Sequence, residues 1–474
     1  MKTKILIVII IAFLGCATIT KINKTSEVPS EPSELTYPKL VLQPSEPQRI
    51  VLDNGLVVYL LEDHELPVLK VKITTRTGSI YDPADKVGLA ELCGAVMRIG
   101  GTEKIDGDAL DEKLEFMAAS VETSIGLESG NSSLDVMSKD WEEGLFLLFD
   151  VLRNPAFAEN KIELHKNKMK DEVLRQNDNP TKIATREFYF KVFGKDSPWA
   201  RKPTVESIDN ISRDDLIEFH KKYYVPNNSI MSVAGDFDKD GFIAKLKELT
   251  NDWNSKDVSL PEVEPIPEPE GPVVYSISRE VTQSNIRLGH LGLRRHDPDK
   301  YAIEILSFIL GEGGFTSRLM SEVRSNRGLA YAVGSIITEG ADRGKFTAYS
   351  ITKSESSIAA IELMRDIISD MCVNPPTKEE MHRAKETLSN QFVFRYDSSS
   401  KIVNQKAAME YFNYPHDYLE TYLEKLNTVT AEDVLAAAKK HLHPEKLVIL
   451  VLGKPGDLDK PLETLGKVVN VDIE

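Results

Sequence analysis

Alternating apolar and polar positions near residue 60 predict two β-strands. In segments 55–63 and 68–79 apolar residues recur at about every second position, as in strands with one buried face. The short sequence HELP, residues 64–67, separates them. The pattern therefore predicts an antiparallel pair of strands joined by a turn.

Apolar residues spaced three or four positions apart predict helices farther along the chain. The predicted helices span residues 87–98, 107–118, 139–152, 159–176, 182–192 and 213–223. Strands mixed with helices in this way indicate an α+β fold, in which helices pack on one face of a mostly antiparallel sheet.

The pattern of segment 211–235 returns in segment 429–453, at a constant offset of 218 residues. Each copy contains Ser or Thr as a helix N-cap, an amphipathic helix, a proline and a β-rich run that ends at Gly. Five aligned pairs are identical: Asp215/Asp433, Lys221/Lys439, Lys222/Lys440, Pro226/Pro444 and Gly235/Gly453. A looser match joins IYDPADKVGLAEL with RHDPDKYAIEIL. Two matches in the same order predict two homologous domains.

Proline-rich segments divide the chain into these domains. Five prolines and four glutamates within LPEVEPIPEPEGP exclude a helix or a central strand, so residues 258–272 are expected to form a linker. The N-terminal domain is then predicted at 49–257 and the C-terminal domain at 273–474. Residues 17–48, rich in Pro and Ser, are expected to form a tether.

Composition narrows the classes of function. The 474 residues are 41% hydrophobic, which is enough for packed domains. The net charge of −16 argues against nucleic acid as a partner, because nucleic-acid-binding surfaces are basic. Three widely spaced cysteines offer neither a disulfide framework nor a CxxC metal knuckle. Cys93 and Cys372 are expected to be small buried hydrophobic residues.

The N-terminal sequence MKTKILIVIIIAFLGC predicts export from the cytoplasm. Two lysines precede an apolar run that is too short to span a bilayer, as in a signal peptide. Its FLGC ending resembles a bacterial lipobox, so residues 1–16 are expected to be a lipoprotein signal peptide with lipid attached to Cys16. The alternative is an ordinary signal peptide with a nearby cysteine. A lipid-anchored protein of the cell envelope, on the periplasmic side of the outer membrane, is the resulting expectation.

The segment VGLAELCGAVMRIGGT, residues 87–102, carries a family resemblance. Together with GSIYDP before it and a second similar half, it resembles the pitrilysin/insulinase family of zinc peptidases, the inverzincins, whose metal motif is H-x-x-E-H. The resemblance places Glu91 and Ala95 where the two histidine ligands stand, and Gly94 where the catalytic glutamate stands. Glu172 follows Ala95 with 76 residues between them, and occupies the position of the third ligand.

Three of the four metal-site residues are therefore missing. Two carboxylates without imidazole make a poor zinc site, and Gly94 has no group that takes a proton from water. Glu91 and Glu172 either hold a metal weakly or are solvated or salt-bridged helix residues. His165, seven residues before Glu172, and the pair His441 and His443 are further candidates, for which surface or helix-end roles are the simpler interpretation.

The second half carries GEGGFTSRLMSEVRSNRGLAY, which resembles the family's R-x-x-x-Y segment. The resemblance implies that Arg327 and Tyr331 hold the substrate backbone and stabilise the reacting carbonyl, as directional donors can. The alternative is a surface salt bridge for Arg327 and a tyrosine that caps the core. The glycines at 311–314 lack a G-K-[ST] ending and are expected to form a turn with positive φ rather than a phosphate loop.

Three functions remain open from the sequence. The leading hypothesis is the non-catalytic, substrate-binding subunit of a heterodimeric zinc metallopeptidase, with no cofactor of its own. A homologous partner with an intact zinc motif would supply the metal, and the substrate would be a peptide or unfolded polypeptide. The second hypothesis is a structural or binding lipoprotein that reuses the fold. The third is an active zinc endopeptidase with a relocated site.

Overall fold

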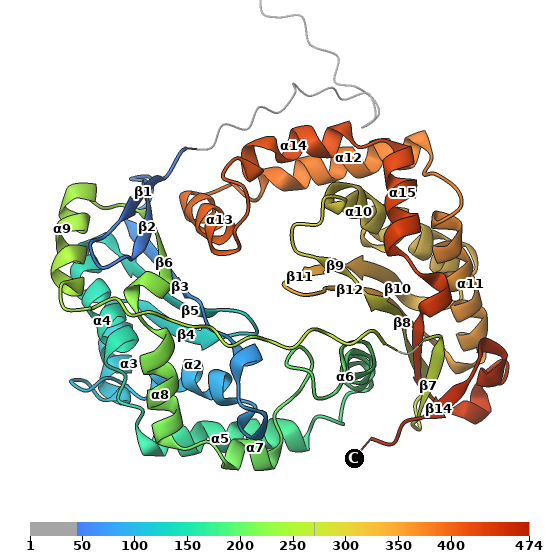
Figure 1. Ribbon diagram of the computed structural model, residues 1–474, viewed down its shortest axis with the longest axis horizontal. Coiled ribbons are helices and arrows are strands. Elements are labelled where there is room, and N and C mark those ends of the chain that lie inside the picture. The colour runs from blue at the N-terminus through green and yellow to red at the C-terminus, as the bar shows by residue number, and fades with distance from the viewer. Residues whose placement is uncertain (1–44, 270, 474) are drawn as a thin grey trace, which may run out of the picture. The chain divides into compact units, whose positions relative to one another are not determined.

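Two six-stranded sheets form the framework of the protein, whose computed structural model describes residues 45–269 and 271–473 (Figure 1). The predicted signal peptide with Cys16, and the tether up to residue 44, lie outside the described residues. The first sheet contains β1 (Gln48–Val51), β2 (Val57–Glu62), β3 (Val68–Thr75), β4 (Ser120–Ile125), β5 (Gly130–Met137) and β6 (Ser229–Gly235). The second contains β7 (Val273–Ser278), β8 (Gln283–Leu291), β10 (Ala330–Ile337), β12 (Lys345–Lys353), β13 (Val448–Gly453) and β14 (Val468–Asn470). The short strands β9 (Leu293–Arg294) and β11 (Glu339–Gly340) pair separately.

The strand order repeats between the sheets. The first sheet runs β1-β2-β6-β3-β5-β4, and the second, taken from its other edge, runs β14-β7-β13-β8-β12-β10. In each, the strand that ends at the repeated glycine is parallel to one neighbour and antiparallel to the other. The predicted α+β fold of two homologous halves is therefore confirmed.

The predicted hairpin between segments 55–63 and 68–79 is wrong. Strands β2 and β3 form at the predicted places, but β6 lies between them. All seven residues of β6 are buried, so it occupies the centre of the sheet. An alternating pattern shows which face of a strand is buried, but it does not name the neighbouring strand.

Helices form close to their predicted bounds because their end signals are local. Those of the first half are α2 (Leu89–Ile99), α3 (Gly107–Phe116), α4 (Trp141–Arg153), α5 (Glu159–Leu174), α6 (Pro180–Phe193), α7 (Val205–Asp209), α8 (Arg213–Tyr223) and α9 (Lys239–Thr250). Those of the second half are α10 (Lys300–Ser307), α11 (Ser357–Met371), α12 (Lys378–Val393), α13 (Ser399–Tyr411), α14 (Tyr418–Thr428) and α15 (Ala431–His441). The repeated helices α8 and α15 both begin with a capping box, Ser212/Asp215 and Thr430/Asp433, as the duplicated pattern predicts.

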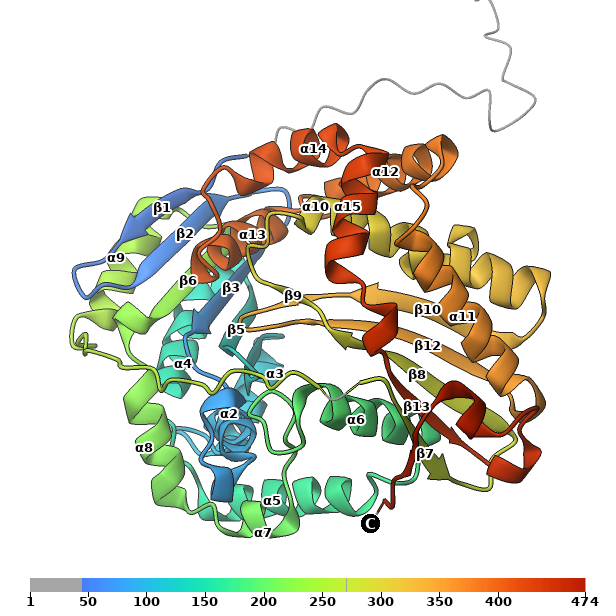
Figure 2. The same ribbon diagram turned by 45° about the vertical axis from the view of Figure 1, so that its right-hand side comes forward.

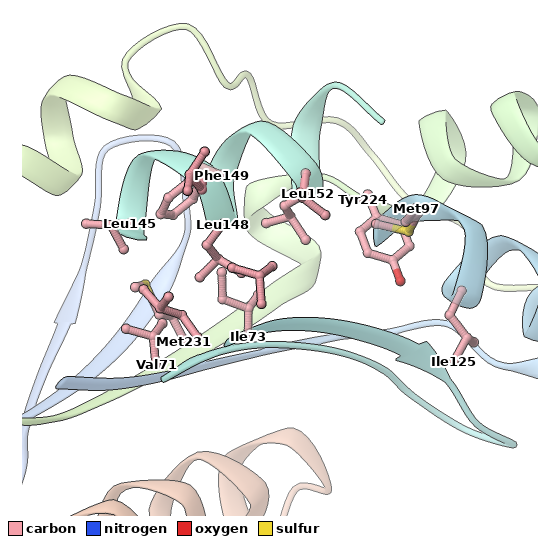
Figure 3. Close-up of a cluster of buried hydrophobic side chains, with 14 of the residues drawn as sticks. Val71, Ile73, Met97, Ile125, Leu145, Leu148, Phe149, Leu152, Tyr224 and Met231 are labelled. Carbon is pink, nitrogen blue, oxygen red and sulfur yellow. The ribbon is translucent and has the colours of Figure 1, made fainter. Parts of the chain in front are cut away.

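The core of the first half lies between its sheet and the covering helices. Leu145, Leu148 and Leu152 of α4 point toward Val71 and Ile73 of β3 (Figure 3). These side chains are between 0 and 2% exposed, so the packing is that of a continuous apolar core.

The opposite face of each sheet is covered by one helix from the other half of the chain. Helix α6 packs Ile183, Phe188 and Val192 against the second sheet, and α13 packs Val403 and Ala407 against the first (Figures 1 and 2). Arg49 of β1 also forms a salt bridge of 2.7 Å with Glu410 of α13. Each half therefore lends one helix, α6 or α13, to cover the sheet of the other half. The domain bounds that the proline-rich segments predict remain a prediction.

The segment between α9 and β7 contains neither helix nor strand among its described residues. It is not fully solvated, since Ile266 is 7% exposed within the core beside the second sheet.

Within 45–269 and 271–473, no helix has both the length and the apolar character needed to cross a bilayer.

Candidate functional site

Helix α2, which carries the degenerate metal motif, begins at a buried carboxylate. Asp82 accepts hydrogen bonds from the amides of Gly88 (2.9 Å) and Ala90 (3.0 Å), so it closes the first turn of α2. Gly88 adopts φ of 106°, which turns the chain into the helix. The apolar side chains of Leu92 and Val96 then anchor α2 in the core.

Burial raises the pKa of Asp82 to about 7. The amides of Gly88 and Ala90 and the charge of Arg201 oppose this rise, and the charge of Glu91 adds to it. The carboxyl group therefore titrates near neutral pH at the N-terminus of the candidate metal helix.

This shift predicts a pH-dependent contribution to stability. Between about pH 4 and pH 7 the unfolded chain has lost the Asp82 proton while the folded chain keeps it. The stabilising contribution therefore declines across this range and is lost once the pH has risen through the folded-state pKa of about 7. We expect the difference in unfolding free energy between wild type and Asp82→Asn to fall by about 4 kcal/mol from pH 4 to pH 8. Urea unfolding at several pH values measures it, and a difference that stays flat would contradict the shift.

The two remaining carboxylates lie on adjacent helices, Glu91 on α2 and Glu172 on α5. Both residues are exposed. Partial desolvation raises the pKa of the Glu91 carboxyl, and the nearby negative charge of Glu172 raises it further. Lys202 and Lys168 act in the opposite direction. Positive charge near the pair therefore comes from lysine side chains of the protein itself.

His165 also lies within electrostatic range of Glu172. Burial lowers the pKa of His165, Lys168 lowers it further, and Glu172 opposes both. Nevertheless, ligand atoms of His165, Glu91 and Glu172 do not gather into a group that could hold a metal among the described residues.

Gly94, at the position of the catalytic glutamate, leaves no space for a side chain. An ideal Cβ on Gly94 would lie 2.4 Å from the amide nitrogen of Ile125 and 2.8 Å from the carbonyl carbon of Ser124, both in β4. The hydroxyl of Thr123 donates to the carbonyl of Gly94 at 2.6 Å, and Arg98 Nε donates to the carbonyl of Val121 at 3.0 Å. Helix α2 thus packs directly on the backbone of β4.

The residues present do not fit a catalytic zinc ion. A zinc site needs three converging ligands and an open position, whereas here the ligand positions hold two carboxylates and an alanine, and the position of the base is closed by a strand. We therefore derive no catalytic step through a metal in this chain.

A different group of side chains, outside the degenerate metal site, is close enough to hold a metal among the described residues. Ligand atoms of Asp297, Asp299 and His441 lie within 4.8 Å of one another. Asp299 already accepts from Lys440 (2.6 Å) and from His441 (2.8 Å), which ties the start of α10 to the end of α15. His443 is not part of this group, and its backbone amide donates to Nε2 of His290 at 3.1 Å. These contacts explain the group as a link between helices.

Arg327 and Tyr331 flank the start of edge strand β10. Arg327 follows the π-helical segment Met320–Asn326 and is exposed, and Tyr331 is 71% exposed. In the described part of the chain, the side chain of Arg327 has no ion pair or hydrogen bond, and the Tyr331 hydroxyl has no hydrogen-bond partner. The structure therefore shows neither the salt bridge nor the core-capping tyrosine of the alternative interpretation.

An aromatic cluster beside this pair was missed by the sequence reasoning. The guanidinium of Arg324 lies 5.8 Å from the ring centroid of Tyr331 and 5.1 Å from that of Phe315, which is 68% exposed. The sequence did contain a sign that Arg324 lies near this pair. Arg324, in the EVR sequence, precedes Arg327 by three residues, which is about one helical turn.

The glycine run 311–314 serves two purposes. Gly314 has φ of 58°, which confirms the expected turn. Gly311 lies in the π-helical segment Phe308–Glu312, where an ideal Cβ would be 2.1 Å from the amide nitrogen of Ser335 in β10. The amide of Ile337 donates to Ser307 Oγ at 3.2 Å. The segment after α10 thus packs on β10 as α2 packs on β4.

Comparisons with known proteins find relatives of both halves of the chain. A family model described as insulinase (peptidase family M16) matches residues 57–197, and one described as the peptidase M16 inactive domain matches residues 210–388. An uncharacterized zinc protease of Rickettsia felis is 25% identical over 402 residues, which cover 82% of this chain and 93% of the relative.

Two solved structures share the fold. A peptidase M16 inactive domain from Pseudomonas fluorescens is 30% identical with a TM-score of 0.79, covering 88% of this chain and 100% of that chain. A protease from Helicobacter pylori is 19% identical with a TM-score of 0.76, covering 86% and 100%. With two related halves and the frame of the metal helix in the first, the chain belongs to the insulinase family of peptidases, peptidase family M16.

Proposed function

We propose that this chain is the non-catalytic, substrate-binding subunit of a heterodimeric zinc metallopeptidase. The observation that carries the proposal is a contrast between the two halves. In the first half, β4 fills the space of the catalytic glutamate at Gly94. In the second half, the donors of Arg327 and Tyr331 are exposed and unpartnered among the described residues.

The chemistry of this pair suits a peptide or unfolded polypeptide. A guanidinium and a phenol donate directional hydrogen bonds to main-chain carbonyl oxygens, and both stabilise charge that develops on a carbonyl. A homologous partner with an intact H-x-x-E-H motif would supply the zinc and the general base. The Rickettsia relative described as a zinc protease supports a peptidase context, and the Pseudomonas structure described as an inactive domain supports a chain without catalysis of its own.

The proposed location is the bacterial envelope. The basic and apolar N-terminal run ending at Cys16 supports a lipid anchor, and the Pro/Ser-rich segment after it supports a tether. The periplasmic side of the outer membrane is the proposed place of this anchor.

A structural or binding lipoprotein is the second candidate, and one observation favours it. The backbones of two of the four edge strands of the six-stranded sheets, β4 and β10, contact the protein's own helices through Gly94, Arg98 and Ser307. An added peptide strand would have to displace these contacts, so the fold could serve as a scaffold without binding substrate.

Metal analysis and peptide cleavage separate these functions. We expect the purified chain to contain far less than one zinc per molecule and to cleave no peptide, and we expect cleavage when the zinc-bearing partner, obtained by pull-down of the native protein, is added. Stoichiometric zinc with cleavage by the isolated chain would contradict the proposal. Recovery of partners without peptidase activity would favour the scaffold.

A further inference from the structure

A pocket of about 430 Å³ lies in the first half, apart from the degenerate metal site. It forms where the segment after α4, helix α8 and the segment after α9 meet. Its lining includes four cationic side chains and two acidic ones, although the chain as a whole carries a net charge of −16. The pocket lining thus carries more positive than negative side chains, although the protein as a whole is acidic.

Two of the cations are arginines held in place by main-chain carbonyls. Arg153 donates to the carbonyl of Leu249 at 2.7 Å and pairs with Asp252 at 2.7 Å. Arg213 donates to the carbonyls of Phe157 (2.9 Å) and Ala156 (2.9 Å). Because these groups are fixed before any ligand arrives, less side-chain entropy is lost on binding.

The other two cations are Lys221 and Lys256. Within the described residues, neither these lysines nor Arg213 forms an ion pair with a carboxylate. The pKa of nearby His220 falls to about 4, mainly through burial, although its bond to the Leu152 carbonyl opposes the fall and the charges of both lysines add to it. His220 is therefore neutral at physiological pH, and both ammonium groups act on the same buried ring.

The second half provides an internal comparison. At the offset of 218 residues, α15 repeats α8 with the same capping box and the same following strand. Arg213 and His220 correspond there to Ala431 and Ala438, whereas Lys221 corresponds to Lys439. The duplicated fold is thus built without this set of polar groups, so packing alone does not require them.

We propose that this pocket binds a phosphate group. The paired donors of both arginines are engaged by oxygens of the protein itself, so the arginines contribute fixed positive charge rather than a bidentate contact. Lys221 and Lys256 add point charges, free of carboxylate partners among the described residues, that balance a dianion. The group could belong to free inorganic phosphate or to the head group of a phospholipid. The inference goes beyond the proposed peptidase function and stands without it.

Calorimetric titration of the full chain tests the pocket with inorganic phosphate and with glycerol 3-phosphate, a soluble analogue of a lipid head group. Sodium chloride at equal ionic strength is the control for screening. We expect saturable binding of at least one phosphate compound, weakened roughly tenfold by Lys221→Gln and by Lys256→Gln. Lys439→Gln, the matched change in the repeated helix, should leave binding unchanged.

The relative affinities identify the source, since tighter glycerol 3-phosphate binding points to a lipid and tighter inorganic phosphate binding to the free ion. Heat effects no larger than with chloride would overturn the proposal. Equal affinities for wild type, Lys221→Gln and Lys256→Gln would also overturn it. Both substitutions alter exposed lysines, and thermal melts of the variants confirm that each is folded.

Discussion

Replacing Gly94 with alanine should lower the free energy of unfolding by about 3 kcal/mol or more, although it adds a single methyl group. The new Cβ would lie 2.4 Å from the amide nitrogen of Ile125, and a backbone atom in a paired strand cannot move aside as a flexible side chain can. Either α2 or β4 must shift, which disturbs the buried side of α2. Chemical denaturation of the purified variants measures the loss.

Gly126→Ala is the matched control. Gly126 follows the same strand and is exposed, and an ideal Cβ there would meet its nearest atom, the carbonyl oxygen of Ser129, at 3.8 Å. We expect a change of about 0.5 kcal/mol or less. Equal stabilities of Gly94→Ala and wild type would show that α2 does not depend on contact with β4.

The same contact limits attempts to rebuild the metal site. The combined change Glu91→His, Gly94→Glu and Ala95→His restores the motif in sequence, but its glutamate has no space. The pair Glu91→His and Ala95→His alters exposed or half-buried positions and keeps Gly94. The pair should therefore fold, and the triple variant should be strongly destabilised.

Arg327→Ala should lower kcat/KM of the proposed heterodimer about 100-fold or more, the loss seen when one donor to a developing oxyanion is removed. Tyr331→Phe should cause a similar loss because it removes only the donating hydroxyl. Both side chains are exposed, so the variants should fold and assemble normally. Peptide cleavage by the reconstituted pair measures the effect.

Two exposed residues of the same half serve as controls. Arg383→Ala on α12 removes an equivalent charge, and Tyr349→Phe on the neighbouring strand β12 removes an equivalent hydroxyl. Neither should change kcat/KM by more than about twofold, or roughly 0.4 kcal/mol. Loss of activity in the controls as large as in Arg327→Ala would assign the effect to general charge or packing.

Local signals in the sequence were sufficient to predict individual helices and strands, but not to predict which strands pair with one another. The helix at 213–223 was predicted at its observed bounds because its cap, apolar face and following proline are contiguous. The insertion of β6 between β2 and β3 joins segments more than 150 residues apart, and no local pattern specifies that pairing.

At the candidate site, too, the sequence revealed the residue types but not their neighbours in space. The sequence revealed that Gly94 lacks a proton acceptor, but not that Ser124 and Ile125 fill the space beside it. The phosphate pocket was not predicted, since Arg153, Arg213 and Lys256 meet only in the folded chain. The exposure of Arg327 and Tyr331 also became visible only when β10 was placed at the sheet edge.

Because α6 and α13 each cover the sheet of the other half, neither half is expected to be stable alone. Separated from its counterpart, the first sheet would lose the cover that Val403 and Ala407 provide, and the second would lose Phe188. Each half alone would then present an apolar sheet face to water, which favours aggregation. The arrangement is what a domain-swapped homodimer of half-length ancestors would leave after gene fusion, with the covalent link replacing dimer affinity.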